Sequence, residues 1–245
     1  MFYNGHMKVI HLNEINSTND YVKKNISELD HLTFVYSDRQ TSGRGRLQRT
    51  WVDSGDENLF LTIVIKPENK SKFPYANFTQ YLCVILSLVL EEDYNLIPQI
   101  KWPNDVLING KKIAGILAEG SVRGGELVGL ALGIGVNLNT THDKLLKIDK
   151  PATSIFNEIG TVTDKTVFLE KLYNKFCLLY DKFVCEGFTS IKNSFEKRAM
   201  FIGKQISINV LGEIHEGIAV GVTDEGSLIL KEGTKKNIYY IGDIL

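Results

Sequence analysis

The chain has 245 residues, 43% of them hydrophobic and 23% charged, and its formal net charge is -1. This length allows one large domain, alone or with a small companion, and the composition is that of an ordinary globular protein with no overall demand for a nucleic-acid partner. The longest apolar stretch, residues 83–90, is far too short to span a bilayer, and residues 1–8 lack the apolar core of a signal peptide. We therefore expect no membrane association.

The three cysteines, Cys83, Cys177 and Cys185, form no CxxC pair. The first two lie in apolar, periodic stretches, where a reduced thiol packs as a small hydrophobic group. We therefore expect a reduced protein in the cytoplasm.

Hydrophobic periodicity predicts strands and helices in the first hundred residues. The expected elements are a strand at 9–15, a helix at 21–29, strands at 32–37 and 59–65, a helix at 75–92 and a strand at 99–102. Residues 17–20 supply several good N-caps for the first helix. Residues 38–58 have almost no apolar periodicity, and a loop of this length is usually functional or disordered.

A hairpin signature follows at residues 105–119. Asn109-Gly110 separates two apolar runs, and this dipeptide tolerates the positive φ angles of a type I′ turn. Gly124-Gly125 then reverses the chain into a strand at 127–136. The pattern predicts a meander of antiparallel strands.

The last third of the sequence changes from helices to short strands. The expected elements are helices at 167–184 and 191–198 and strands at 205–210, 214–222, 227–230 and 238–241. The regular spacing of these strands is typical of a small β-barrel. We therefore predict an α+β fold, with a mixed, largely antiparallel sheet packed with helices over residues 1–198 and a small barrel over residues 199–245.

Residues 39–51 hold four arginines in an otherwise nearly neutral chain, and two of them alternate with glycine in Gly43-Arg44-Gly45-Arg46. The donor forks of arginine, and the close backbone approach that glycine allows, favour an anionic ligand. The clustering of charge fits a solvated basic loop equally well. Single-stranded nucleic acid stacked on Trp51 is a third alternative, although no wider basic surface and no further aromatic residues nearby support it.

Several common catalytic signatures are missing from the sequence. No glycine-lysine-serine or glycine-lysine-threonine run follows the arginine-rich segment, which excludes a P-loop. Gly133-Ile134-Gly135 begins like a dinucleotide fingerprint, but Leu138 stands where the third glycine belongs. The histidines lack metal-ligand spacing, and no GxSxG elbow occurs. Hydrolase, metalloenzyme and Rossmann interpretations lose their usual support.

Two further clusters place polar residues at strand ends. Lys101-Trp102-Pro103-Asn104-Asp105 fits either a turn closed by its amide and carboxylate or a polar group at the mouth of a sheet. Lys111 and Lys112 begin a strand whose next six residues are apolar or glycine, so this strand is expected to be buried on both faces. Alternation sends the two lysines to opposite sides of the sheet, without saying which one faces the interior. Both fit soluble strand ends equally well.

Five clusters occur together in this sequence. In chain order they are Ser17-Thr18-Asn19, Gln40 with the arginine-rich run through Arg49 and Trp51, Lys101 to Asp105, Lys112 with Ala114-Gly115-Ile116-Leu117 and Glu119, and Gly133 with Gly135 and Asn137. In this order and spacing, from about residue 9 to residue 140, the sequence resembles the biotin–protein ligases. The resemblance implies a catalytic core like that of class II aminoacyl-tRNA synthetases, followed by an SH3-like C-terminal domain.

The resemblance also implies a site with a biotin side and a nucleotide side. The biotin side comprises Ser17, Thr18, Asn19, Gln40, Gly43, Arg44, Gly45, Arg46, Lys112 and Gly115. The nucleotide side comprises Arg46, Arg49, Trp51, Lys101, Asn104, Asp105, Lys112 and Asn137. Lys112 matches the family's active-site lysine, and with Arg46 it is expected to stabilise charge on the phosphoryl oxygens as the catalytic pair.

The resemblance implies the reaction and its partners as well. The carboxylate of biotin attacks the α-phosphate of ATP, Mg²⁺ neutralises the departing pyrophosphate, and a lysine of a biotin carboxyl carrier protein domain takes biotin from the adenylate. The arginine-rich loop is expected to be mobile when empty and to close over the adenylate. About sixteen residues precede Ser17, too few for the winged helix-turn-helix of regulatory members, so we expect a catalytic protein that binds no operator DNA. The residues that bind Mg²⁺ and the oligomeric state, a homodimer included, stay open.

Two alternatives to this function remain. A lipoate–protein ligase is expected to share the catalytic core, with a different acid in the pocket. A nucleic-acid-binding module would use residues 39–51 and the terminal barrel, and it predicts steeply salt-dependent binding to single strands.

Overall fold

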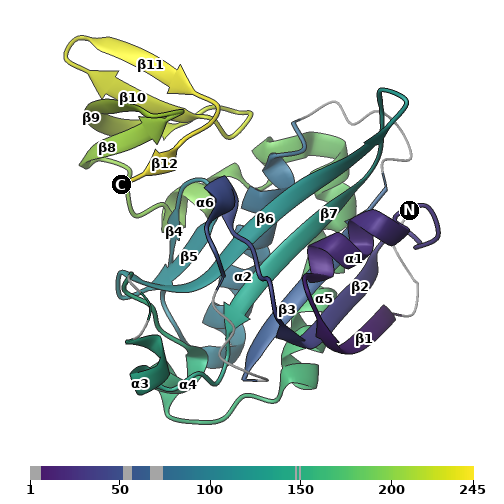
Figure 1. The fold of residues 1–245 in the computed structure, drawn as a ribbon. Coiled ribbons are helices and arrows are strands. Elements are labelled where there is room, and N and C mark those ends of the chain that lie inside the picture. The colour runs from purple at the N-terminus through teal and green to yellow at the C-terminus, as the bar shows by residue number, and fades with distance from the viewer. Residues whose placement is uncertain (1–6, 52–56, 67–73, 147, 149) are drawn as a thin grey trace.

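The computed structural model describes all residues except 1–6, 52–56, 67–73, 147 and 149. A seven-stranded sheet with the order β1-β2-β3-β7-β6-β5-β4 forms the centre of the molecule (Figure 1). Its strands are β1 (Lys8–Ile15), β2 (Thr33–Gln40), β3 (Asn58–Ile65), β4 (Pro98–Lys101), β5 (Asp105–Ile108), β6 (Lys111–Arg123) and β7 (Glu126–Asn137). Among the described strand pairs of this sheet, only β1 and β2 run parallel, so the predicted mixed, largely antiparallel sheet is confirmed.

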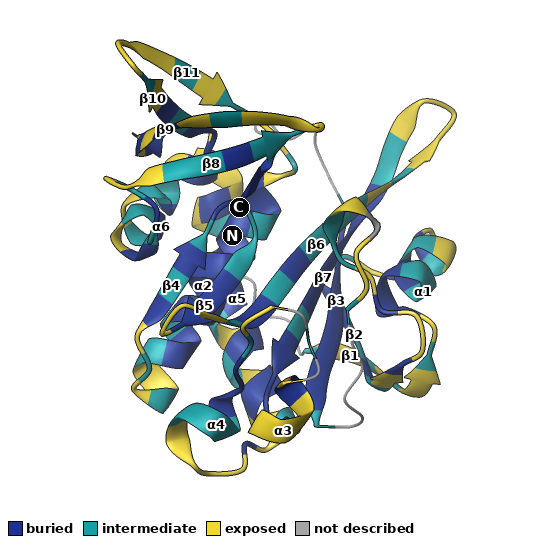
Figure 2. Cartoon of the chain, turned by 60° about the vertical axis from the view of Figure 1, so that its left-hand side comes forward, coloured by how far each residue is buried: buried dark blue, intermediate teal, exposed yellow. Residues whose placement is uncertain are grey.

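Helices lie on both faces of this sheet. They are α1 (Thr18–Asn25), α2 (Asn77–Tyr94), α3 (His142–Leu145), α4 (Ile155–Ile159), α5 (Lys165–Glu186) and α6 (Lys192–Arg198), with 3-10 turns η1 (Arg46–Gln48) and η2 (Gly187–Ser190). The long helices α2 and α5 cover one face, where they form the larger hydrophobic core, and α1 lies on the other (Figures 1 and 2). A smaller core joins Val22 of α1 and its C-cap residue Ile26 to Val35, Val64 and Ala131 of the sheet. No helix in the described part of the chain is long and apolar enough to cross a membrane.

The turns of the meander follow the predicted chemistry. Asn109 and Gly110 have φ angles of 52° and 75°, and Gly124 and Gly125 have φ angles of 58° and 84°. Glycine reaches this left-handed region without the penalty of a Cβ atom, and asparagine tolerates it better than most residues. These turns place β5, β6 and β7 side by side. Residues that are far apart in the sequence therefore become neighbours on adjacent strands at the centre of the sheet.

A second sheet follows α6, with the order β11-β10-β9-β8-β12. Its strands are β8 (Gln205–Val210), β9 (Glu213–Val222), β10 (Leu228–Glu232), β11 (Lys235–Tyr239) and β12 (Asp243–Ile244). Within residues 199–245, all of which are described, β11 and β12 lie at opposite edges of an open sheet. The predicted small antiparallel β unit is present, and a closed barrel is not formed by these strand pairs. The last long strand also lies earlier than the predicted 238–241, because the turn at Gly233 starts β11 at Lys235.

Three side-chain donors fasten this second sheet to the rest of the protein. Gln80 Nε2 and Trp102 Nε1 donate to the Gly226 carbonyl at 2.7 and 3.1 Å, and Asn77 Nδ2 donates to the Glu225 carbonyl at 2.8 Å. A Cβ atom on Gly226 would overlap the Gln80 amide. The turn between β9 and β10 therefore fits closely into a polar socket made by α2 and Trp102.

Candidate active site

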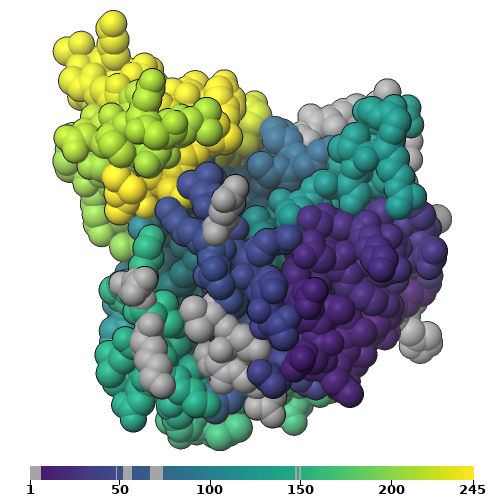
Figure 3. Space-filling view, in the orientation of Figure 1, coloured from purple at the N-terminus to yellow at the C-terminus, as the bar shows by residue number. Residues whose placement is uncertain are grey.

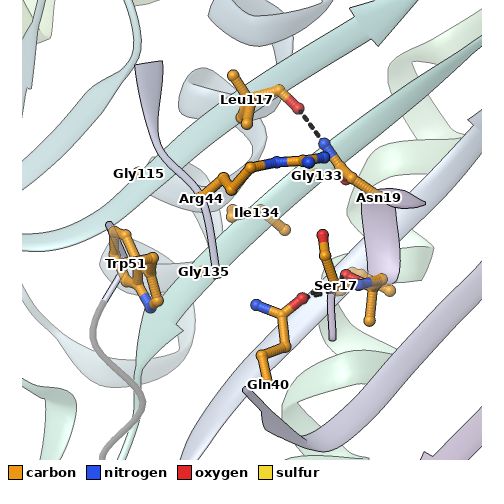
Figure 4. Close-up of a pocket in the computed structure, with 12 residues that line it drawn as sticks. Ser17, Asn19, Gln40, Arg44, Trp51, Gly115, Leu117, Gly133, Ile134 and Gly135 are labelled. Atoms are coloured by element: carbon orange, nitrogen blue, oxygen red, sulfur yellow. Dashed lines mark hydrogen bonds between the residues drawn. The ribbon is translucent and has the colours of Figure 1, made fainter. Parts of the chain in front are cut away.

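A small cavity of about 30 Å³ lies where the start of α1 meets the centre of the large sheet (Figure 4). Its lining comprises Ser17, Thr18, Asn19, Gln40, Arg44, Trp51, Leu61, Gly115, Leu117, Gly133, Ile134 and Gly135. Seven residues of the expected site thus converge from α1, β2, β6 and the arginine-rich loop. In the space-filling view, residues 40–51 fill the face between the purple N-terminal elements and the yellow C-terminal sheet (Figure 3).

The start of α1 is joined to the end of β2 through Gln40. The Gln40 Oε1 atom accepts from the Thr18 backbone N–H at 2.8 Å and lies 3.1 Å from the Thr18 hydroxyl oxygen. Ser17 is the N-cap, but its side chain makes no capping hydrogen bond. Because Gln40 satisfies the first helical N–H group instead, the Ser17 hydroxyl is not committed to the cap and lines the cavity.

Asn19 is clamped between three strands. Its Nδ2 donates to the Leu117 carbonyl at 3.2 Å and to Glu119 Oε2 at 2.8 Å, and its Oδ1 accepts from the Thr62 hydroxyl at 2.6 Å. A Cβ atom on Gly133 would overlap Asn19 Oδ1, so glycine is required at the position where the amide lies. Asn19 therefore uses both of its N–H groups within the protein, and its role is to hold the wall of the cavity.

Two facing glycines form a flat floor beneath Trp51. Gly115 on β6 pairs with Gly135 on β7. A Cβ atom on Gly135 would lie 2.6 Å from Cε2 of Trp51, and one on Gly115 would lie 2.9 Å from Cζ3. The indole therefore occupies space that any larger residue on these strands would fill (Figure 4). Its buried Nε1 has no hydrogen-bond partner among the described residues.

Arg44 extends across the cavity to two acidic residues. Its guanidinium lies 2.6 Å from Asp20 Oδ1 on α1 and 3.1 Å from Glu119 Oε2 on β6. Burial favours a higher pKa for the Glu119 carboxyl, but hydrogen bonds from Lys23 and Asn19 and the charges of Lys23 and Arg44 outweigh it and hold the pKa below its usual value. Burial also opposes the ionised form of Asp20, but hydrogen bonds and charges from Arg44 and Lys23 outweigh it and lower the pKa of that carboxyl. Both acids are therefore ionised at neutral pH, and Arg44 connects the loop to opposite walls.

The size of the cavity bears on how a ligand enters. Pockets for small molecules usually measure on the order of 300–1,000 Å³. A cavity of about 30 Å³ holds little more than a water molecule. A bicyclic acid fits only if Trp51 or Arg44 moves, and this requirement agrees with the loop motion expected from the sequence.

Lys112 lies beside the cavity, whereas Lys111 is exposed. The Lys112 Nζ atom is 2.7 Å from Asp105 Oδ1 and 5.3 Å from the centroid of the Trp51 ring. A Cβ atom on Gly115 would lie 2.8 Å from this Nζ atom, so the ammonium group crosses the glycine floor. The structure thus answers the question of which lysine faces the interior.

The C-terminal sheet reaches the arginine-rich loop through β12. Arg46 lies 3.3 Å from Asp243 Oδ1 and donates to the Gly242 carbonyl at 3.1 Å, and Arg49 lies 3.2 Å from Asp243 Oδ2. Arg46 also donates to Asn104 Oδ1 at 3.3 Å. Two expected nucleotide-side arginines therefore share one buried carboxylate from the end of the chain.

The remaining expected residues lie around this centre or at its margin. Lys101 is half-buried, and burial lowers the pKa of its ammonium group although nearby Asp105 opposes the shift. Asn137 is buried at the end of β7, and its Nδ2 donates to the Thr153 carbonyl at 2.9 Å, so its amide is engaged away from the cavity. Gly43 lies beneath Trp51, and a Cβ atom there would be 2.8 Å from the Trp51 carbonyl. Gly45 donates its N–H to the Arg49 carbonyl within the loop at 2.7 Å.

The sequence interpretation missed three residues that organise the site. Thr62 reads as one more β-branched residue of a buried strand, and Asp243 lies at the other end of the chain from the loop. Glu119 was part of the recognised pattern but carried no role. Among the described residues, no group of three or more His, Cys, Asp or Glu side chains is placed to hold a metal ion.

Comparison with known proteins identifies the family. The model of the biotin/lipoate A/B protein ligase family matches residues 12–137, just over half of the chain. The chain belongs to this family. Residues 201–245 match the model of the biotin protein ligase C-terminal domain, which agrees with the separate second sheet.

Two relatives within the ligase family show how much of each protein is shared. A bifunctional ligase/repressor from Bacillus subtilis is 33% identical over 216 residues, which cover 86% of this chain and 65% of that protein. A biotin–acetyl-CoA-carboxylase ligase from Paracoccus denitrificans is 34% identical over 218 residues, which cover 88% of this chain and 90% of that protein. The chain therefore spans slightly less than two thirds of the Bacillus relative and most of the Paracoccus one.

A solved structure shares the whole fold. The biotin protein ligase from Aquifex aeolicus in complex with biotin and ATP superposes with a TM-score of 0.85 and 26% identity, covering 98% of each chain. Both sheets and their arrangement thus belong to the fold of this ligase family.

Proposed function

We propose that this protein is an ATP-dependent biotin–protein ligase that forms biotinyl-5′-AMP and transfers biotin to a lysine of a biotin carboxyl carrier protein domain. The observation that carries the proposal is the convergence of Ser17, Thr18, Gln40 and Arg44 on one cavity, with Lys112 at its end. The Aquifex and Paracoccus relatives support it, because the first was solved with biotin and ATP and the second is named as a ligase for acetyl-CoA carboxylase.

The cavity is assigned to biotin. Hydroxyl and amide groups at the start of α1 and the end of β2 suit a ureido ring, which carries both donors and an acceptor. The ten expected biotin-side residues contribute in three ways. Five of them, Ser17, Thr18, Asn19, Gln40 and Arg44, line the cavity with their side chains. The glycines at positions 43, 45 and 115 give backbone and ligand room to approach, and Arg46 and Lys112 are shared with the nucleotide side.

The nucleotide is assigned to the space beside Lys112, Asn104 and Arg46. The attack of a carboxylate on the α-phosphate builds negative charge on the phosphoryl oxygens, and fixed cations stabilise that charge most when solvent is excluded. Lys112 is anchored by Asp105 on a rigid hairpin, and Arg46 is anchored by Asn104 and the end of the chain. Both groups therefore act as the catalytic cations. Arg49, Trp51, Lys101 and Asn137 complete the nucleotide side.

Mg²⁺ is assigned to the phosphates of ATP and not to a protein cage. The described residues offer no cluster of acidic ligands, and Mg²⁺ commonly binds through substrate phosphates with few protein ligands. Its chemistry would be to neutralise the departing pyrophosphate.

Two organisational assignments accompany the function. We place the catalytic domain at residues 1–198 and the C-terminal domain at residues 199–245, because the second sheet begins directly after α6. The free thiols of Cys83, Cys177 and Cys185 fit the reducing cytoplasm.

The test separates biotin from lipoate and then adds the acceptor. The exchange of labelled pyrophosphate into ATP should depend on biotin and not on lipoate, and addition of a carrier domain should yield a biotinylated lysine. Exchange that depends on lipoate and not on biotin would show that the substrate is a dithiolane acid instead of biotin. Exchange supported by neither acid, together with steeply salt-dependent binding to single-stranded nucleic acid, would refute the ligase assignment.

A further inference from the structure

Thr62 connects the floor of the large sheet to the start of α1 without lining the cavity. It lies on β3 with 0% of its surface exposed. Its Oγ1 atom is 2.8 Å from Thr18 Oγ1 and 2.6 Å from Asn19 Oδ1. One buried hydroxyl therefore contacts two consecutive residues of the proposed biotin site.

The positions of the hydrogens in this cluster follow from its partners. Asn19 Nδ2 faces the Leu117 carbonyl and the Glu119 carboxylate, so the other amide atom, Oδ1, is the one that faces Thr62. An amide oxygen can only accept, and a hydroxyl has a single hydrogen to donate. The Thr62 hydroxyl therefore donates to Asn19.

This direction decides what Thr18 offers to a ligand. Since the Thr62 hydrogen is committed to Asn19, the contact of 2.8 Å between the two hydroxyl oxygens requires the hydrogen of Thr18, so Thr18 donates to Thr62. The Thr18 hydrogen therefore stays within the protein. Thr18 lines the cavity, and its oxygen is left to act toward a ligand as an acceptor.

The same contacts hold the first turn of α1 in place. Thr62 pairs across the sheet with Gly133, whose missing side chain makes room for Asn19. The side chain of Ser17, the N-cap, makes no capping hydrogen bond, so the turn is held through Thr18 and Asn19. The hydroxyl of Thr62 thus links β3 to the side chains of both Thr18 and Asn19.

We propose that Thr62 is a positioning residue that determines specificity for a ureido ring, by holding Thr18 as a hydrogen-bond acceptor. A ureido ring has N–H donors that match such an acceptor, whereas a dithiolane ring has none. This inference rests on the proposed function as a biotin ligase. The inference adds Thr62, which does not line the cavity but determines whether the Thr18 hydroxyl acts toward a ligand as a donor or as an acceptor.

Two pairs of variants isolate the hydroxyl. Thr62→Val keeps the shape and removes the hydroxyl, and Thr62→Ser keeps the hydroxyl and removes a methyl group. Thr62→Ala differs from Thr62→Ser only by the hydroxyl, so this second pair decides the matter if the valine variant fails to fold. Ser37→Ala is the matched control, because it removes a buried hydroxyl on the adjacent strand β2 that has no hydrogen-bond partner among the residues that the structure describes.

The readout is the KM for biotin and for ATP, with kcat, in biotin-dependent pyrophosphate exchange, together with the Tm of each variant without ligand. Thr62→Val and Thr62→Ala should raise the KM for biotin roughly tenfold, equivalent to about 1.4 kcal/mol, with kcat and the KM for ATP close to wild type. Thr62→Ser and Ser37→Ala should keep the wild-type KM for biotin. A lowered Tm with an unchanged KM for biotin would reduce Thr62 to a structural residue and overturn the inference. Wild-type protein with no biotin-dependent exchange would refute the proposed function instead.

Discussion

The glycine floor beneath Trp51 gives a prediction whose magnitude follows from the structure. In Gly115→Ala, the added methyl carbon would lie 2.8 Å from Lys112 Nζ and 2.9 Å from Trp51 Cζ3, both closer than real Cβ contacts. Overpacking of this kind typically costs about 1–3 kcal/mol. The lysine end is flexible, and Trp51 belongs to the loop that is expected to move, so both neighbours can yield. We therefore expect a cost near the lower end of this range.

The cost should appear in the use of biotin. About 1.4 kcal/mol corresponds to a tenfold change, so the KM for biotin should rise roughly tenfold in pyrophosphate exchange. Gly120→Ala is the matched control on the same strand, since its methyl carbon would meet only the end of the Leu127 side chain, at 3.0 Å. Equal KM values for the two variants would refute the claim that the bare floor is part of the biotin site.

Three further predictions concern the ion pairs of Glu119, the polar socket around Gly226 and the arginine-rich loop. Because the pKa of Glu119 is lowered in the folded protein, its ion pairs stabilise the protein fully above about pH 4.5 and lose this effect as the pH falls below it. In urea denaturation, Glu119→Gln should have a free energy of unfolding lower than wild type by on the order of 1 kcal/mol at pH 7, and the difference should shrink toward pH 4. A difference that stays constant with pH would contradict this. Gly226→Ala should lower the free energy of unfolding by more than Gly233→Ala does. Both glycines have a positive φ angle, but only an added methyl group on Gly226 would meet other atoms. Equal losses for the two variants in denaturant unfolding would show that the close fit of the socket does not contribute to stability. Trypsin cleavage within residues 44–49 should slow when biotin and ATP are both added, and an unchanged rate would exclude closure of the loop.

The sequence allowed the meander and its turns to be predicted because their causes are local. Asn109-Gly110 and the apolar runs beside it carry the turn geometry in neighbouring residues. Periodicity likewise placed the two long helices: α2 is buried on nearly all sides, and α5 buries one face. The choice of Lys112 over Lys111 needed the family resemblance, since strand alternation separates the two lysines without naming the buried side.

The parts that escaped prediction depend on contacts between distant segments. Asp243 meets Arg46 across nearly the whole chain, and no local pattern marks a strand end as the partner of a loop. Thr62 has the composition of any buried strand residue, and its importance comes only from the amide that lies against it. Asn137 likewise makes a distant contact, because its side-chain amide donates to the Thr153 carbonyl, and no spacing within the motif indicates that partner. Whether the C-terminal strands close into a barrel also depends on long-range pairing, and no strand pair joins β11 to β12 within residues 199–245.

The central claim is that Lys112, fixed beside the glycine floor, stabilises the developing charge on the phosphoryl group. The most direct measurement is biotinylation of a carrier domain with biotin and Mg-ATP by wild type, Lys112→Ala and the neighbouring control Lys111→Ala. Loss of one fixed electrostatic donor commonly lowers kcat about 10²–10³-fold. We predict a loss of this size in Lys112→Ala and wild-type activity in Lys111→Ala, whose side chain is exposed. Undiminished biotinylation by Lys112→Ala would contradict the account.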